Sequence, residues 1–151
     1  MKRLLALAAA LAVAVAVVAA TTASGNANQA GSTTIRVNAK TTSFNQVGQG
    51  VGSIITFTDD LFQNGKKIGT DVVACIVTGP GDVQECYATD TLPKGQISSM
   101  GPSDPVTQPR FPVAITGGTG AYRDAWGTSD VNLIDQENST YVYHVDGVLG
   151  G

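Results

Sequence analysis

Residues 70–92 read TDVVACIVTGPGDVQECYATDTL, and this stretch decides how the chain folds. Two β-rich runs flank Gly79-Pro80-Gly81-Asp82, a cluster of residues that is typical of a turn. A hairpin that turns at Pro80-Gly81 pairs residue 79 with 82 and therefore Cys75 with Cys86. Directly opposed residues on antiparallel strands have β-carbons close enough for a disulfide. We predict a hairpin closed by a Cys75–Cys86 disulfide; a free, reactive thiol is the alternative.

The same alternation of short β-rich runs and turn residues continues on both sides of this hairpin. Asn64-Gly65 accepts the positive φ angles of a tight hairpin turn, and Pro93-Lys94-Gly95 marks another turn. Short connections favour antiparallel pairing, because parallel neighbours need long crossovers. We predict eight strands, at about 33–44, 51–60, 70–78, 83–92, 95–101, 109–116, 126–135 and 139–149.

Eight antiparallel strands form either a sandwich or a closed barrel. Closure is favoured because it removes the exposed sheet edges that invite aggregation. We therefore expect an all-β protein, an eight-stranded antiparallel barrel. Such a barrel has an interior just wide enough for packed side chains or one small ligand.

The first residues have the pattern of a secretory signal peptide. Met1-Lys2-Arg3 precedes an apolar run, Leu4 to Ala20, and small residues follow it. A retained membrane anchor is the alternative, but the run is short and rich in Ala. We expect a signal peptide at 1–20 with cleavage somewhere in 20–30, a disordered leader at 21–32, and one domain at 33–151. The mature chain would then be secreted, with no membrane association.

The composition argues against several classes of partner. The 151 residues include 9 basic and 12 acidic side chains; without Lys2 and Arg3 the balance is 7 against 12, a net charge of −5. A nucleic-acid partner would call for clustered Lys and Arg. One His and two Cys offer no metal-ligand spacing, so we expect neither a metal nor a cofactor.

Three segments together resemble the allene oxide cyclase family and its dirigent-like relatives. They are 51–69 (VGSIITFTDDLFQNGKKIG), 95–102 (GQISSMGP) and 113–127 (VAITGGTGAYRDAWG). The third is similar to the family signature Gly-Gly-Thr-Gly-x-(Phe/Tyr)-x-x-Ala-x-Gly. The resemblance implies a lipocalin-like eight-stranded barrel, often trimeric, whose mostly apolar cavity holds a reactive molecule while it cyclises or couples.

The catalytic pattern of allene oxide cyclases carries over poorly to this chain. Its first-strand Glu-x-Asn reads Arg36-Val37-Asn38 here, so a cation replaces the carboxylate. The Asn of its Phe-Thr-Asn is Asp59, and the Tyr that follows its Gly-Pro is Ser103. The family's pocket Cys corresponds to Cys75, whose sulfur we expect to be bonded. Plant-type allene oxide cyclisation is therefore not expected.

The remaining candidates are polar residues on predicted strands. Asp59 shares a face with Phe57, and burial there would make it a general acid or base; a solvated strand end is the alternative. We name Asp59 and Asn38 as candidate catalytic residues that look into the barrel, and Arg36, Ser103, Phe57 and His144 as candidate ligand contacts. Strand alternation puts His144 on the face opposite Tyr141 and Tyr143. A lone His on a strand is usually a surface or interface residue, which we favour here; if His144 faces the cavity instead, it is the best proton carrier available.

Three functions remain open at this point. The first is a secreted barrel that binds a small, mostly apolar molecule and guides its cyclisation or isomerisation by confinement. The second is a non-catalytic carrier of a lipophilic ligand. The third is an extracellular structural or interaction module whose interior is filled by side chains. An interior volume below about 300 Å³ would favour the third.

Overall fold

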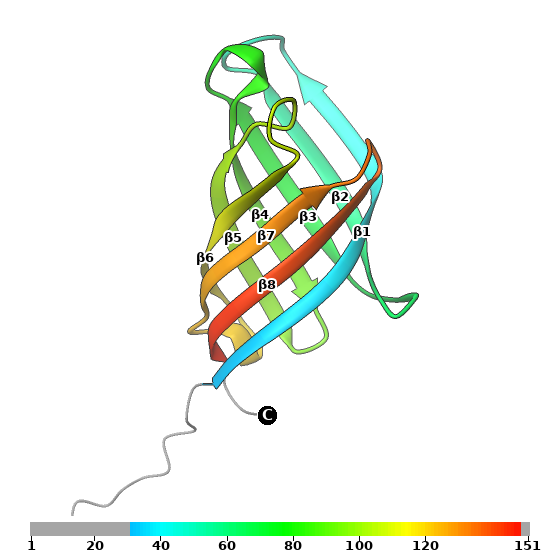
Figure 1. The fold of residues 1–151 in the computed structure, drawn as a ribbon, viewed down its shortest axis with the longest axis vertical. Coiled ribbons are helices and arrows are strands. Elements are labelled where there is room, and N and C mark those ends of the chain that lie inside the picture. Colours follow the sequence, from blue (N-terminus) through cyan, green and yellow to red (C-terminus); the bar gives the residue numbers. More distant parts are fainter. Residues whose placement is uncertain (1–30, 149–151) are drawn as a thin grey trace, which may run out of the picture.

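The computed structural model describes residues 31–148, which form a β-barrel with two short 3-10 turns (Figure 1). The strands are β1 (Gly31–Val47), β2 (Ile54–Gln63), β3 (Lys66–Val77), β4 (Gln84–Leu92), β5 (Gly95–Ser103), β6 (Arg110–Gly118), β7 (Trp126–Leu133) and β8 (Asn138–Val148). The 3-10 turns are η1 (Pro80–Asp82) and η2 (Gly120–Tyr122). Neither turn has the length or apolarity that a helix needs to span a bilayer, and residues 31–148 contain no other helix.

The eight strands close on themselves in chain order. Each strand pairs antiparallel with its neighbours in the sequence, and β1 pairs with β8 to complete the ring. The predicted antiparallel barrel is therefore confirmed, and the sandwich is wrong. The closed ring gives every strand two hydrogen-bonded neighbours, and the pairing is shortest between β5 and β6, where it runs from Ile97 to Met100 on β5.

The connections between strands follow the turn residues of the sequence. Asn64 and Gly65 link β2 to β3 with φ angles of 53° and 77°, which a primed turn requires at both positions. β4 and β5 are joined through Pro93-Lys94, with Leu92 opposite Gly95. Such short links keep each strand beside the preceding one.

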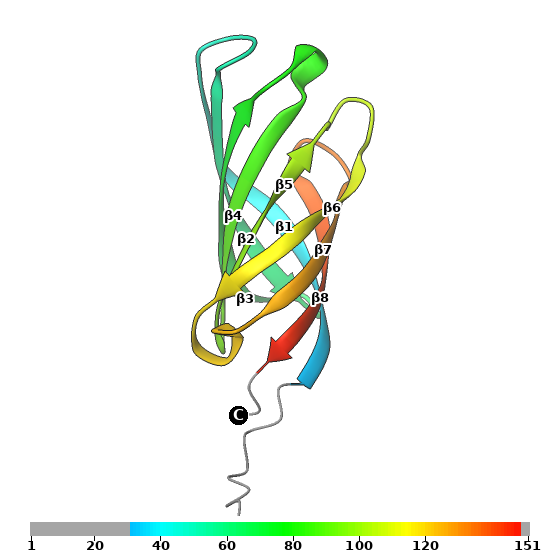
Figure 2. The same ribbon diagram turned by 90° about the vertical axis from the view of Figure 1, so that its left-hand side faces the viewer.

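The two ends of the barrel differ. At the lower end of Figure 1, where η2 and the first residues of β1 lie, an apolar cluster fills the interior. Its buried members are Val37, Ala39, Leu61, Leu92, Ile97, Ile115, Tyr122, Ala125, Tyr141, Tyr143 and Val145. At the upper end the loops 48–53, 78–83, 104–109 and 134–137 surround the opening (Figures 1 and 2). Beyond Thr41, β1 pairs with β2 alone, because β8 begins opposite Lys40.

Several predicted boundaries shift. β1 begins at Gly31, so residues 31 and 32 belong to the barrel and not to the predicted leader. β3 begins at Lys66, four residues before its predicted start, because the turn at Asn64-Gly65 returns the chain directly into the sheet. The predicted signal peptide and residues 21–30 of the leader lie outside the described residues.

Candidate active site in the barrel interior

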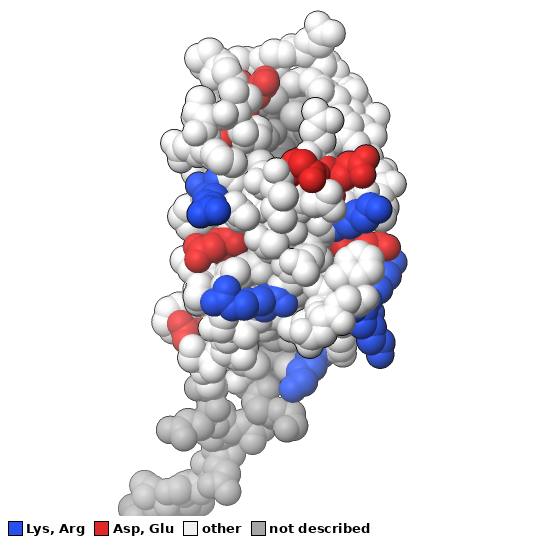
Figure 3. Space-filling model, turned by 45° about the vertical axis from the view of Figure 1, so that its right-hand side comes forward, with Lys and Arg blue, Asp and Glu red and all other residues white. Residues whose placement is uncertain are grey.

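Strand alternation lines the interior with one face of each strand. On β3, Asp71, Val73, Cys75 and Val77 are buried, and the residues between them are exposed. The upper half of the interior contains a cavity of about 60 Å³. Its lining includes Asp71, Val73, Cys86, Ala88, Asp90, Ser99, Phe111, Val113, Ser129, Val131, Tyr141 and Tyr143. Figure 3 shows that the surface is hollowed at this upper end.

Three aspartates lie side by side across the interior wall. Asp59 on β2 is the register partner of Asp71 on β3, and Asp71 is the partner of Asp90 on β4. Their exposed fractions are only 2%, 1% and 2%. The row lies between the packed lower core and the cavity above it, since Asp71 and Asp90 line the cavity and Leu61 and Leu92 follow toward the closed end.

Two tyrosines from β8 hydrogen-bond to the outer members of this row. The Tyr141 hydroxyl donates to Asp59 Oδ2 at 2.7 Å, and the Tyr143 hydroxyl donates to Asp90 Oδ1 at 2.7 Å. The two rings meet edge to face with centroids 6.2 Å apart. The Tyr143 hydroxyl thus reaches across the interior from β8 to β4, and the Tyr141 hydroxyl reaches past β1 to β2.

Two carboxylate oxygens of the row have no hydrogen-bond partner. They are Asp59 Oδ1 and Asp71 Oδ1, both fully buried. An unpaired buried oxygen costs about 1–3 kcal/mol, more when it is charged. Since native interiors leave few such groups, each unpaired oxygen suggests that a water or ligand completes the site.

Burial controls the protonation of the aspartates. It raises the pKa of Asp90 to about 7, against the lowering effect of the Tyr143 hydrogen bond and with a further increase from Asp59. Burial raises the pKa of Asp71 well above its usual value, and the negative charges of Asp90 and Asp59 raise it further. Burial also raises the pKa values of Tyr141 and Tyr143. Near neutral pH, Asp90 can therefore both accept and donate a proton.

No basic side chain of the described residues compensates these carboxyl groups. Every Lys, Arg and His between residues 31 and 148 is exposed, and the ion pairs of this region involve Asp60, Asp124 and Asp130 on the outer surface. In the same residues, no group of three or more His, Cys, Asp or Glu side chains is arranged to hold a metal ion. Within residues 31–148 the three interior aspartates therefore form no ion pair.

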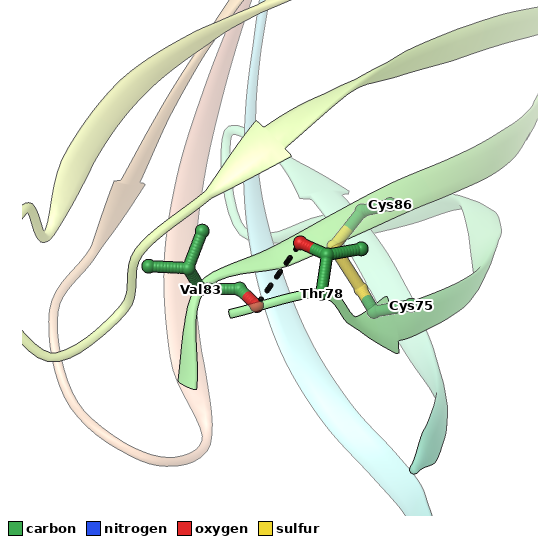
Figure 4. Close-up of a disulfide and its surroundings, with 4 residues drawn as sticks. All are labelled: Cys75, Thr78, Val83 and Cys86. Atoms are coloured by element: carbon green, nitrogen blue, oxygen red, sulfur yellow. Dashed lines mark hydrogen bonds between the residues drawn. A yellow bond between two sulfur atoms is a disulfide. The ribbon is translucent and has the colours of Figure 1, made fainter. Parts of the chain in front are cut away.

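The predicted disulfide is confirmed. Cys75 and Cys86 are register partners on β3 and β4 and are bonded to each other. Figure 4 shows the bond beside the connection in which Thr78 Oγ1 donates to the Val83 carbonyl oxygen at 3.3 Å. Both sulfurs belong to the interior face, and Cys86 lines the cavity.

The structure places the predicted site residues in two groups. Asp59 is buried on the interior face, as expected, Phe57 lies half-buried on the same face, and Ser103 is buried at the upper end of β5. His144 lies on the outer face, 3.3 Å from Asp130 Oδ2. The roles assigned to these residues stay predictions.

The predicted inward orientation of Asn38 is wrong. Val37 and Ala39 occupy the interior positions of β1, and a period of two turns Asn38 and Arg36 outward. Both line a separate outer groove of about 330 Å³ beside Gln63. A ligand held inside the barrel therefore cannot touch Asn38 or Arg36.

Sequence reasoning missed Asp71 and Asp90, although a signal for them was present. The hairpin register that pairs 75 with 86 also pairs 71 with 90, because each residue lies four positions further from the turn. Four positions along a strand preserve the face. Two inward cysteines therefore predict two inward aspartates.

The sequence and the structure were compared with known proteins. The family model described as "Allene oxide cyclase barrel like domain" matches residues 33–145. No curated protein sequence matches the chain. A structure titled "Pyocyanin demethylase" is similar with a TM-score of 0.67 and 29% identity, and the match covers 75% of this chain and 99% of that one.

Two other solved structures show the fold at lower identity. The pterocarpan synthase dirigent protein PsPTS1 has a TM-score of 0.66 at 15% identity, over 80% of this chain and 97% of its own. The Diels Alderase AbmU from Streptomyces koyangensis has a TM-score of 0.61 at 16% identity, over 83% of this chain and 72% of its own. With the family match spanning most of the residues that the structure describes, the chain belongs to the allene oxide cyclase barrel like domain family.

Proposed function

We propose that this barrel binds a small, mostly apolar molecule in its upper half and promotes the cyclisation or isomerisation of that molecule. The observation that carries the proposal is the pair Asp90–Tyr143 on the floor of an apolar cavity, with the Asp90 pKa at about 7. Solved structures with similar barrels include a dirigent protein, two Diels Alderases and a demethylase, which supports small-molecule chemistry in this fold.

Proton transfer by Asp90 would need no external reactant. The ionised carboxylate removes a proton from one atom of the bound molecule, and the resulting acid returns it to another atom of the same molecule. An isomerisation of this kind leaves the enzyme unchanged. General acid–base catalysis is most effective when the pKa lies near the working pH. Confinement in the cavity adds the orientation that cyclisation requires.

The test is product formation by the purified protein from small-molecule extracts of the producing cells, followed by mass spectrometry. Asp90→Asn keeps the shape of the side chain and removes proton transfer, so the rate should fall by about 10²–10⁴-fold. Asp124→Asn is the matched control, because Asp124 is exposed and lies outside the barrel interior. An Asp90→Asn variant that keeps the wild-type rate would remove Asp90 from the mechanism.

A second candidate is the packed module without a ligand. The observation in its favour is the cavity volume of about 60 Å³, well below the roughly 300 Å³ of typical ligand sites. A ligand of common size would therefore have to extend from the cavity into the open upper end. A carrier differs from both, since it would release its ligand chemically unchanged after long incubation.

We infer that the chain is exported. The basic start and apolar run of residues 1–20 support a signal peptide, and the Cys75–Cys86 bond suits an oxidising compartment. N-terminal sequencing of the protein from the culture medium should give a start within residues 21–31. Intact chains beginning at Met1 in the cell fraction alone would contradict export.

A homotrimer, which the family resemblance implies, has support on the outer surface. Exposed apolar side chains on β2 to β5 lie in adjacent pairs, Ile54 beside Ile76 and Tyr87 beside Met100. Contiguous apolar patches on a soluble protein commonly mark interfaces. Light scattering after size exclusion should give three times the chain mass, and Tyr87→Glu should reduce it. A monomer in wild type would exclude the assembly.

A further inference from the structure

The aspartate row would carry three negative charges if every member were ionised, which is more than the interior can hold without a compensating charge. Asp59, Asp71 and Asp90 are neighbours on adjacent strands, and all three are almost completely buried. Their side-chain partners within residues 31–148 are two neutral tyrosine hydroxyls, and no basic side chain faces them. Asp71 also accepts hydrogen bonds from the backbone of Val72 and Thr89. Buried carboxylates are stable only when they are paired or protonated. The row therefore favours whatever supplies positive charge.

The unpaired oxygen of Asp71 indicates where a positive charge or a hydrogen-bond donor would bind. Asp71 lies at the centre of the row, lines the cavity, and its Oδ1 contacts no hydrogen-bond donor of the described chain. A donor or cation in the cavity would complete the coordination of that oxygen. The other polar groups that line the cavity are small hydroxyls, those of Ser99 and Ser129, together with the two tyrosines.

We propose that the ligand of this barrel is an organic cation, a largely apolar molecule with one positive charge that lies against Asp71 and Asp90. This inference rests on the proposed function, because it names the class of molecule that the same cavity would take. Aromatic side chains at the cavity, Phe111, Tyr141 and Tyr143, add faces on which a cation is favourable. A metal ion is a poorer fit, since the carboxylates of the described residues do not converge on one point.

Binding of a cation should expel protons from the row. The titratable groups that face the cavity and its floor are Asp59 from β2, Asp71 from β3, Asp90 from β4, and Tyr141 and Tyr143 from β8. The buried inward positions of β1, β5, β6 and β7 are apolar or Ser. A nearby positive charge stabilises the ionised carboxylates, so binding of a cation releases protons from the row. Affinity should then rise with pH, by about tenfold per pH unit for each proton released.

The experiment compares two probes of equal shape and different charge. 1-Methylquinolinium is a permanent cation, and 1-methylnaphthalene is its neutral counterpart. Fluorescence titration of the quinolinium, with the naphthalene as competitor, gives both affinities at pH 8. We expect the cation to bind at least tenfold more tightly. Calorimetry at pH 6.5 in phosphate and in Bis-Tris should give different heats, because the two buffers take up the released protons with different enthalpies.

Variants separate the charge of the row from the shape of the cavity. Asp71→Asn should lower the ratio of cation to neutral affinity at least fivefold and leave the affinity for 1-methylnaphthalene within twofold. Asp124→Asn removes an equal charge from the outer surface and should leave the ratio unchanged. Near-UV circular dichroism checks that each variant keeps the native packing.

The outcomes distinguish this inference from the proposed function. Equal binding of the two probes would overturn the cation preference and leave the apolar cavity in place. A preference that survives in Asp71→Asn and also in Asp90→Asn would overturn the role of the row. Absence of binding by either probe would overturn both the inference and the proposed cavity.

Discussion

Replacing Asp90 by Asn changes how the free energy of unfolding of this barrel depends on pH. Burial raises the pKa of Asp90 from 3.8 to about 7 in the folded chain. The folded state therefore binds this proton more tightly than the unfolded state does. The resulting stabilisation is fully present below about pH 4 and is lost as the pH rises through about 7.

The size of the effect follows from the pKa difference of about 3. A difference of one corresponds to about 1.4 kcal/mol, so ionisation of Asp90 in the folded chain costs about 4 kcal/mol above pH 7. Asn cannot ionise, and its Oδ1 can still accept the hydrogen bond of Tyr143. Asp90→Asn should thus match wild type near pH 4 and exceed it by about 4 kcal/mol at pH 8.

Urea unfolding followed by far-UV circular dichroism measures this difference. Both proteins are unfolded at pH 4 and pH 8 without ligand, and the free energies are compared at each pH. Asp124→Asn, an exposed substitution of the same kind, should show a difference close to zero at both values. If the gap between Asp90→Asn and wild type is the same at pH 4 and pH 8, burial does not control the Asp90 carboxyl.

Three further substitutions test the barrel itself. Replacing both Cys75 and Cys86 by Ala should lower the free energy of unfolding by about 3 kcal/mol, measured by urea unfolding against wild type with and without reductant. Gly69→Ala should prevent soluble expression, because the added carbon would meet the Thr91 carbonyl oxygen at 2.0 Å; wild-type yield would contradict this register. Leu61→Ala, at a position with 0% exposure, should cost about 2–5 kcal/mol in the same unfolding assay, and a loss below about 1 kcal/mol would mean that the lower core is loosely packed.

Turn chemistry and hairpin register made most of this fold predictable. Asn64-Gly65 and Pro93-Lys94 each mark a reversal that the structure contains. The pairing of Cys75 with Cys86 followed from the position of one turn. Closure of the ring was an argument about exposed edges, and the pairing of β1 with β8 confirms it. The turns and the hairpin register depend on local backbone geometry, which residues close together in the sequence determine.

The candidate site was only partly predictable. Asp59 was placed correctly because it shares a strand face with Phe57. Asn38 was placed by family resemblance, although strand alternation turns it away from the face of Val37 and Ala39. The contact between Tyr141 and Asp59 joins residues 82 positions apart. Such a contact depends on how the barrel closes and how wide it is, and no local pattern encodes it.

The opening and the two outermost described residues, Gly31 and Val148, lie at opposite poles of the barrel. Gly31 and Val148 are register partners at the closed end, and the loops around the opening lie at the far end (Figure 1). A reporter or an immobilising tag joined next to Gly31 or Val148 would therefore leave the opening clear. The lower core contains no residue of the four loops around the opening. Those loops can therefore be exchanged for others while the core continues to stabilise the barrel.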